Sequence, residues 1–216
     1  MKGSERAKKS NYISLFWLFM IGSVIGFVLE GIWHAIRWGG WEDHSAVVWG
    51  PFCIIYGVAA AVLYLAAHHL SDKRAAVQFL VCAAVGSAVE WISAVFQERV
   101  FDSYSWDYSE QVFHLDGKVS LFMTCLWGAL GVAFIRLLFP FLAKHLPKMS
   151  GGGWSVACVC LSVFMTLNLL LTATAVWRWG EREDAIPASN SFEDFLDERY
   201  DDEAMEKIFP NMKFRE

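Results

Sequence analysis

Charged residues are scarce in this chain. They make up 19% of its 216 residues and lie mostly in short clusters and at the two ends, whereas apolar residues make up 56%. The chain has no basic patch with interleaved aromatic residues, which argues against a nucleic-acid partner. Its long uncharged stretches of about 20 residues suit the thickness of a bilayer core. The composition therefore argues against a soluble protein and predicts an integral membrane protein.

Several catalytic and cofactor-binding motifs are missing as well. The chain has no Gly-x-x-x-x-Gly-Lys-Ser/Thr loop, so it cannot bind and hydrolyse ATP in the usual way. It lacks a convincing Ser/His/Asp or Cys/His arrangement. Its five cysteines fall inside apolar stretches at spacings unlike those of a metal site, and we interpret them as small buried apolar residues. The sequence thus predicts no catalytic residue, no metal and no cofactor, and the balance is against an enzyme.

Five apolar stretches are present, covering roughly residues 12–36, 50–69, 75–96, 119–139 and 154–177. They lack the alternation of a membrane β-barrel, so we expect helices, with Pro140 bending or ending the fourth. The predicted fold is all-α, a polytopic membrane helix bundle with about five transmembrane helices. Its predicted parts are a basic cytoplasmic N-terminus (1–11), the transmembrane bundle (12–177) and a short, acidic, amphipathic C-terminal tail (178–216).

The distribution of Lys and Arg predicts the orientation. With the N-terminus in the cytoplasm, the outer loops hold three such residues and the inner segments before the tail hold nine: Lys2, Arg6, Lys8, Lys9, Lys73, Arg74, Arg136, Lys144 and Lys148. The opposite topology reverses this bias. We therefore expect a multi-pass protein of the cell (plasma) membrane with a cytoplasmic N-terminus. Five spans would place the tail outside, unless a re-entrant segment near Gly50–Pro51 changes its side.

The tail has the features of short helices. Ser191 followed by Asp194 can cap a helix. Apolar residues then recur at helical spacing in two sets, and Pro210 ends the second; the sets are Phe192, Phe195, Leu196 and Tyr200, then Ala204, Met205, Ile208 and Phe209. Such a tail should dock on the bundle, on the membrane interface or on a partner. The alternative is a loosely held end.

The clearest functional signal is a pair of acids inside apolar spans. Glu30 and Glu90 each stand four residues after a glycine. A lone carboxylate in a membrane span costs on the order of 3 kcal/mol, so it usually faces the bundle interior or a wet cavity. Both glutamates, together with Asn168 of the fifth span, are expected at one level in the outer half of the bilayer. The alternative is structural, with each carboxylate held by Trp, Tyr or backbone N–H groups, or neutralised by Arg99.

The outer loops are rich in Trp, Tyr, Asp, Glu and Gly, and function on a scaffold often concentrates in such loops. Combined with the acids, they suggest a lidded polar site rather than an ordinary aromatic belt. His34 shares a helix face with Glu30, but no second such pair is found, so we favour an interfacial histidine over a metal ligand. The predicted binding residues of this polar pocket are Glu30, Glu90, Asn168, Arg99, Trp106, Asp107, Tyr108 and Tyr56.

Small residues and weak repetition suggest how the spans pack. Glycine steps in spans one and three allow close approach, and we expect these two spans to lie side by side. Gly-x-x-x-Glu occurs in both, and Trp-Gly occurs at Trp49–Gly50 and Trp127–Gly128. Two helix pairs followed by a single fifth helix is one interpretation.

The ordered motifs resemble a family of small bacterial integral membrane proteins named as ABC-transporter permeases. The resemblance runs through most of the chain: Gly-x-x-x-Glu of span one, Gly50–Pro51, Tyr56–Gly57, Glu90, Glu98, Trp106–Ser109, Gly117, Trp127–Gly128 and Met205–Met212. One departure is Ala46–Trp49, where the family tends to carry an Asn-Arg-Gly-like element. The resemblance implies a transport role but no particular substrate or catalytic residue.

Three functions follow as hypotheses. The first is a transporter or permease subunit whose polar pocket, built around buried glutamates, takes a small solute or ion. The second is a membrane-embedded enzyme acting on a lipid-like substrate, with Glu30 and Glu90 joined by His34, Asp107 or Tyr108 as acid–base groups. The third is a non-catalytic assembly or regulatory protein that recruits a partner through its tail. The expected partners are membrane lipids and, for an ABC permease, a separate ATPase subunit; a homo-oligomer stays open.

Overall fold

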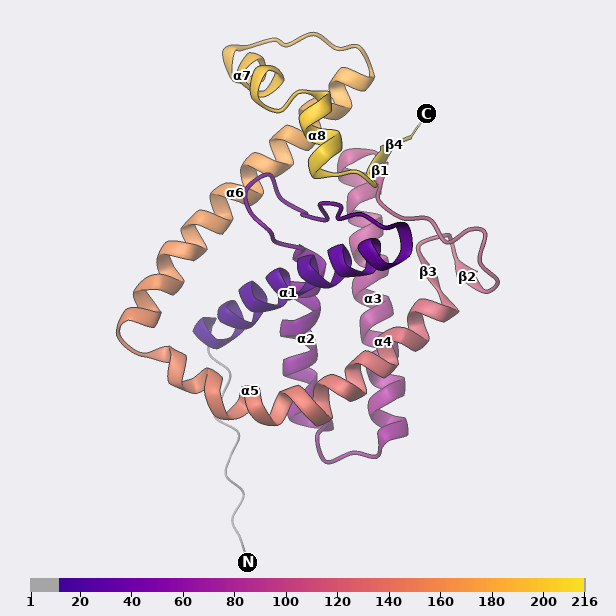
Figure 1. Ribbon diagram of the computed structural model, residues 1–216, viewed down its shortest axis with the longest axis vertical. Coiled ribbons are helices and arrows are strands. Elements are labelled where there is room, and N and C mark those ends of the chain that lie inside the picture. Colours follow the sequence, from indigo (N-terminus) through magenta and orange to yellow (C-terminus); the bar gives the residue numbers. More distant parts are fainter. Residues whose placement is uncertain (1–11, 216) are drawn as a thin grey trace, which may run out of the picture.

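Figure 1 shows the computed structural model, in which residues 12–215 are described. Expectations about the basic N-terminus, residues 1–11, lie outside the described residues. The chain is nearly all helical, which confirms the predicted fold class. Its long elements are α1 (Tyr12–Trp38), α2 (Ile54–Leu70), α3 (Ala75–Phe101), α4 (Leu121–Ala133), a π-helix (Phe134–Leu138), α5 (Phe139–His145), a 3-10 helix (Leu146–Ser150) and α6 (Gly153–Glu183).

Four of the predicted spans are helices long and apolar enough to cross a membrane. They are α1, α3, the continuous stretch Leu121–Met149, and α6; α2 is a shorter apolar helix. The expected second span was wrong at its start, because the helix begins at Ile54 rather than near Gly50. Gly50 has φ +86°, and the N–H of Phe52 donates to the carbonyl of Gly50, so the chain turns here before the helix starts.

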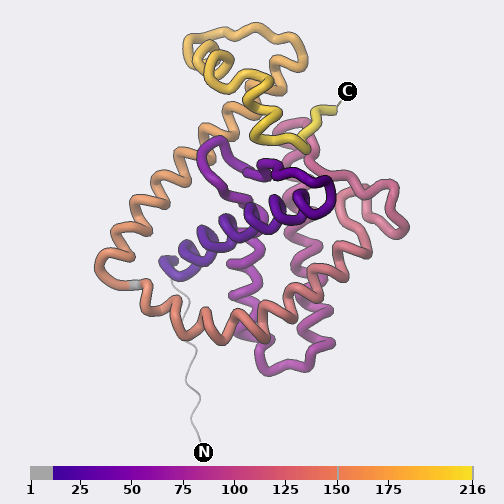
Figure 2. Tube along the Cα trace, viewed as in Figure 1, coloured from indigo at the N-terminus to yellow at the C-terminus, as the bar shows by residue number. Residues whose placement is uncertain are grey.

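The helices pack mainly as two consecutive pairs, α1 with α2 and α3 with α4, which we call the hairpins. In Figure 1 and Figure 2, α1 crosses α2 and α4 crosses α3 at a steep angle. The expectation that spans one and three lie side by side was wrong. Their glycines face the next helix along the chain instead: a Cβ on Gly22 would lie 2.8 Å from the Cβ of Ala60, and one on Gly86 would lie 2.4 Å from the ring of Trp127. The small residues therefore fit each helix closely to its hairpin partner.

Pro140 bends the fourth span without ending it. A proline has no N–H and its ring crowds the preceding turn, which disrupts the regular α-helical ladder. The chain widens into the π-helix immediately before Pro140 and then continues as α5. A π-helical turn of this kind accommodates the missing hydrogen bond inside an otherwise continuous helix.

The tail forms α7 (Ser191–Arg199) and α8 (Asp202–Ile208) and packs on the end of α6, above the hairpins in Figure 1. The buried cluster that holds it is Ala175, Val176, Trp179, Leu196, Tyr200, Met205 and Phe209. The cap of α7 is Asn190, whose side chain accepts from the N–H groups of Phe192 and Glu193, so the expected Ser191 cap was one residue late. The predicted boundary at 177/178 falls inside α6, which continues to Glu183.

Two pairs of short strands lie outside the helices, and one of them includes the end of the tail. Strand β4 (Lys213–Phe214) pairs antiparallel with β1 (Ser103–Tyr104), directly after α3. Strands β2 (His114–Leu115) and β3 (Val119–Ser120) pair in the loop that leads into α4. Of the cysteines, Cys53, Cys82 and Cys158 are buried as predicted, whereas Cys125 and Cys160 are exposed on the apolar helices.

Candidate functional site

Glu90 is buried in α3, with 3% of its surface exposed. Its Oε1 accepts a hydrogen bond from the hydroxyl of Tyr108 at 3.0 Å, and its Oε2 accepts one from the indole N–H of Trp127 at 3.3 Å. The ring of Trp127 lies over Gly86, one turn before Glu90. The missing side chain at Gly86 therefore creates the space in which this indole reaches the carboxylate.

Glu30 has a matching arrangement in α1. Its Oε1 accepts a hydrogen bond from the hydroxyl of Tyr56. The ring of Tyr56 lies over Gly26, one turn before Glu30, where a Cβ would be 2.3 Å from the ring carbon Cγ. Unlike Glu90, Glu30 is partly exposed, and Tyr56 supplies its single hydrogen bond among the described residues. Its second oxygen therefore keeps free capacity to accept.

The groups around Glu30 and Glu90 lie next to each other, through the rings of Tyr56 and Trp127. The ring centroids of Tyr56 and Trp127 are 6.5 Å apart, with the ring planes tilted by 47°. Burial raises the pKa of the Tyr108 hydroxyl, and the charges of Glu90 and Glu30 raise it further. We call Glu30, Tyr56, Glu90, Tyr108 and Trp127 the glutamate cluster.

The glutamate cluster has no cationic side chain of its own. Within residues 12–215, neither Glu30 nor Glu90 makes an ion pair with Lys, Arg or His. The donors to the carboxylates are a phenol, a second phenol and an indole, all of which are neutral. Two acids held by neutral donors in an apolar bundle can accept a proton or a bound cation.

Asn168 lies elsewhere. It is fully buried in α6, where its Oδ1 accepts from the backbone N–H of Trp49 at 3.1 Å and its Nδ2 donates to the carbonyl of Trp49 at 2.7 Å. Thr172, one turn on, accepts from the N–H of Val48 at 3.0 Å. Because both bonds of Asn168 go to backbone, it holds the loop between α1 and α2 against α6, and it does not contact the glutamates.

Three other predicted binding residues make no hydrogen bond or ion pair with Glu30 or Glu90 in the described part of the chain. Arg99 is exposed near the end of α3, away from any ion pair among the described residues, while its neighbour Glu98 pairs with Lys118 and with Arg215 of the tail. Trp106 donates from its indole to the carbonyl of Lys118 at 3.1 Å. Asp107 is exposed and accepts from the N–H and hydroxyl of Ser109, and the N–H bond holds its pKa below the ordinary value. These residues shape the loop that carries Tyr108.

Trp127 was missed as a site residue, although Trp127–Gly128 was noted as a repeated motif. The signal that could have found it is the glycine four residues before each glutamate, which leaves room for an aromatic ring of the following helix. For metal binding, the described residues contain no group of three His, Cys, Asp or Glu side chains placed to hold an ion.

The model of one protein family, described as putative ABC-transporter type IV, matches residues 17–173. The chain belongs to this family. No curated protein and no solved structure matches it. The match begins inside α1 and ends inside α6, so the tail lies beyond the matched region. Together with the long apolar helices, the family indicates a membrane protein.

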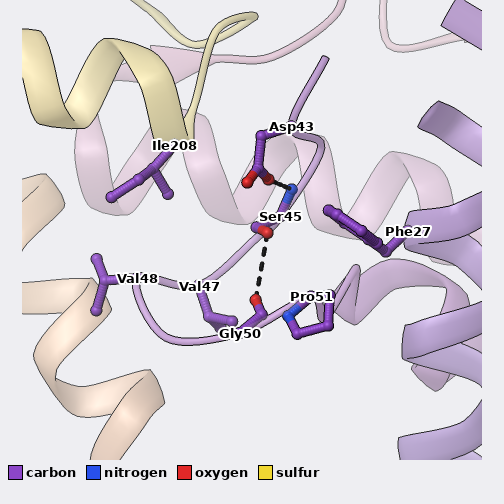
Figure 3. A pocket seen from close by; sticks show the side chains of 8 residues that line it. All are labelled: Phe27, Asp43, Ser45, Val47, Val48, Gly50, Pro51 and Ile208. Carbon is purple, nitrogen blue, oxygen red and sulfur yellow. Dashed lines mark hydrogen bonds between the residues drawn. The ribbon is translucent and has the colours of Figure 1, made fainter. Parts of the chain in front are cut away.

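Ala46–Trp49, where the resemblance suggests a departure from the family, lies in the loop that α6 holds. A hollow of about 270 Å³ lies beside this loop. Figure 3 shows the residues that line it, which are Phe27 of α1, Ile208 of α8 and the loop residues Asp43, Ser45, Val47, Val48, Gly50 and Pro51. A second hollow of about 520 Å³ lies at the other end of the hairpins, beside Gln78 and Arg136. Neither of these two hollows includes Glu30 or Glu90.

Proposed function

We propose that the chain is a transporter or permease subunit that binds a small cation at the glutamate cluster. The observation that carries the proposal is a pair of carboxylates, in an apolar helix bundle, whose described partners are all neutral. Burying a carboxylate without a cationic partner is costly, so such groups in membrane spans usually handle ions or protons. Membership of an ABC-transporter-type family supports the same reading.

The other two hypotheses have less support. Of the three acid–base groups expected for an enzyme, Tyr108 does donate to Glu90. The other two are engaged elsewhere: His34 faces the carbonyl of Gly40 and the carboxylate of Glu42, and Asp107 accepts from Ser109. For an assembly protein, part of the tail is already engaged, because Leu196, Met205 and Phe209 are buried against α6, whereas Phe192 and Phe195 stay exposed. For an ABC permease, ATP hydrolysis would fall to a separate subunit, which we expect at the membrane face opposite the tail.

Charge movement in reconstituted liposomes tests the proposal. The full chain is placed in phosphatidylethanolamine–phosphatidylglycerol vesicles on a solid-supported membrane, and currents are recorded on rapid addition of protons, sodium, ammonium, methylammonium or choline. We expect at least one cation to give a current that Glu30→Gln abolishes. Glu110→Gln, which neutralises an exposed loop carboxylate, should keep the current. Equal currents in wild type and Glu30→Gln, or none from any of these cations, would overturn the proposal.

A further inference from the structure

The two hairpins make the same contacts at matching positions. In each, a phenylalanine of the first helix packs on a glycine of the second, a small residue of the first packs on a small residue of the second, and an aromatic ring of the second covers a glycine of the first. The pairs in α1 and α2 are Phe19–Gly57, Gly22–Ala60 and Gly26–Tyr56. The corresponding pairs in α3 and α4 are Phe79–Gly128, Cys82–Gly131 and Gly86–Trp127.

The matching positions differ by a constant number of residues, one number for the first helices and another for the second helices. Residues 19, 22, 26 and 30 of α1 correspond to 79, 82, 86 and 90 of α3, which are 60 positions later in every case. Residues 56, 57 and 60 of α2 correspond to 127, 128 and 131 of α4, which are 71 positions later. The bonds from Tyr56 to Glu30 and from Trp127 to Glu90 obey the same two offsets. Hence the repeat partner of Trp127–Gly128 is Tyr56–Gly57, rather than Trp49–Gly50.

We infer that the bundle contains a duplicated helix hairpin, and that the two copies have divided their tasks: Glu30 is the carboxylate that binds the cation, whereas Glu90 anchors the loop between α3 and α4 through Tyr108. The first part rests on the matching contacts alone, and the second rests on the proposed function. Membrane transporters commonly bind substrate where such repeats meet, and here Tyr56 meets Trp127.

The division of tasks follows from how each carboxylate is satisfied. Glu90 accepts one hydrogen bond on each oxygen and is 3% exposed, so a ligand cannot reach it and both of its oxygens are already engaged. Glu30 accepts one bond, on Oε1, and is partly exposed. The extra donor at Glu90 is Tyr108, which comes from the loop and has no counterpart at Glu30. A cation can therefore complete the coordination of Glu30 in the way that Tyr108 completes that of Glu90.

Chemical labelling of the two carboxylates tests this division. Dicyclohexylcarbodiimide enters membranes and forms stable adducts with accessible carboxyl groups, which mass spectrometry assigns to single residues. In the full chain in native membranes we expect several-fold more adduct on Glu30 than on Glu90. Combining Tyr108→Phe with Trp127→Phe removes both donors and keeps an aromatic ring at each position, and this double variant should raise labelling of Glu90 toward that of Glu30. Tyr104→Phe, in the same loop but with no contact to the cluster among the described hydrogen bonds, is the control.

The outcomes separate the inference from the proposed function. Equal labelling of both carboxylates in the wild type, or stronger labelling of Glu90, overturns the division of tasks. If the inference holds, the cation that gives a current should also protect Glu30 from labelling. Asymmetric labelling without protection by ammonium, sodium or choline would leave the duplication and the anchoring role of Glu90 standing and would count against cation binding at Glu30, so the two can fail separately.

Discussion

The two hairpins are built alike, but their polar ends differ. In α1–α2 the glutamate is held by one neighbour and stays partly exposed, and the following loop is held from outside the hairpin by Asn168. In α3–α4 the glutamate is buried under two donors, and the loop is held by that glutamate and by the C-terminal strand. The comparison teaches that the same packing of glycines against aromatic rings can hold an accessible carboxylate in one hairpin and a buried, loop-binding carboxylate in the other.

The largest effect is expected from filling the glycines under the rings, because this tests whether the hairpins are alike. Gly26→Ala and Gly86→Ala each place a Cβ within 2.4 Å of a ring carbon. Overpacking of this kind costs about 3 kcal/mol, so both variants should unfold at clearly lower temperature in detergent and by similar amounts. Gly151→Ala, where a Cβ meets nothing within 4 Å, is the control. A loss in one hairpin alone would break the equivalence.

The next effect should fall on the first hairpin only. Asn168→Ala removes two hydrogen bonds and leaves the N–H and carbonyl of Trp49 without these partners, at a cost of about 2 kcal/mol. Hydrogen exchange should then rise sharply in residues 43–53 and stay unchanged in residues 102–120. Thr166→Ala, at an exposed site on the same helix, should change neither. Equal increases in both loops would mean that the loops are not held independently.

A smaller effect concerns the tail, which packs on α6 and whose strand β4 pairs with β1 after α3. The guanidinium of Arg178 donates to Asp197 and holds the pKa of that carboxyl below its ordinary value. Because the folded-state pKa is lowered, the ion pair stabilises the docked tail above the unfolded pKa of about 3.9, and this stability is lost as the pH falls through the folded pKa.

Proteolysis of the tail should therefore accelerate below about pH 4, measured with an acid-active protease. Asp197→Asn should accelerate it already at neutral pH. Glu203→Gln removes an exposed pair with Lys207 and serves as the control, with no expected change. Tail cleavage that does not depend on pH or on Asp197 would show that the apolar cluster alone holds the tail.

Much of the fold could be predicted because it depends on local pattern. Long apolar runs identify candidate spans, and two glutamates among apolar residues point to the candidate site. The packing of spans was missed because a glycine shows that a close approach exists without showing which helix makes it: Gly86 faces Trp127 rather than α1. Asn168 was misplaced for a similar reason, since its level in the bilayer does not determine the backbone that it bonds. The helix that a glycine faces and the backbone that Asn168 bonds both depend on tertiary geometry, and the spacing of residues along one helix does not determine it.

The most direct measurement compares Glu30→Gln and Glu90→Gln in two assays, thermal unfolding and cation-induced current, with Glu110→Gln as the control for both. A glutamine has one acceptor oxygen, so at position 90 it leaves a buried donor unpaired at a cost of about 2 kcal/mol, whereas at position 30 it still accepts from Tyr56. We predict that Glu90→Gln unfolds at a lower temperature and that Glu30→Gln keeps the wild-type unfolding temperature but loses the current. Equal loss of stability in both variants, with equal currents, would contradict the account.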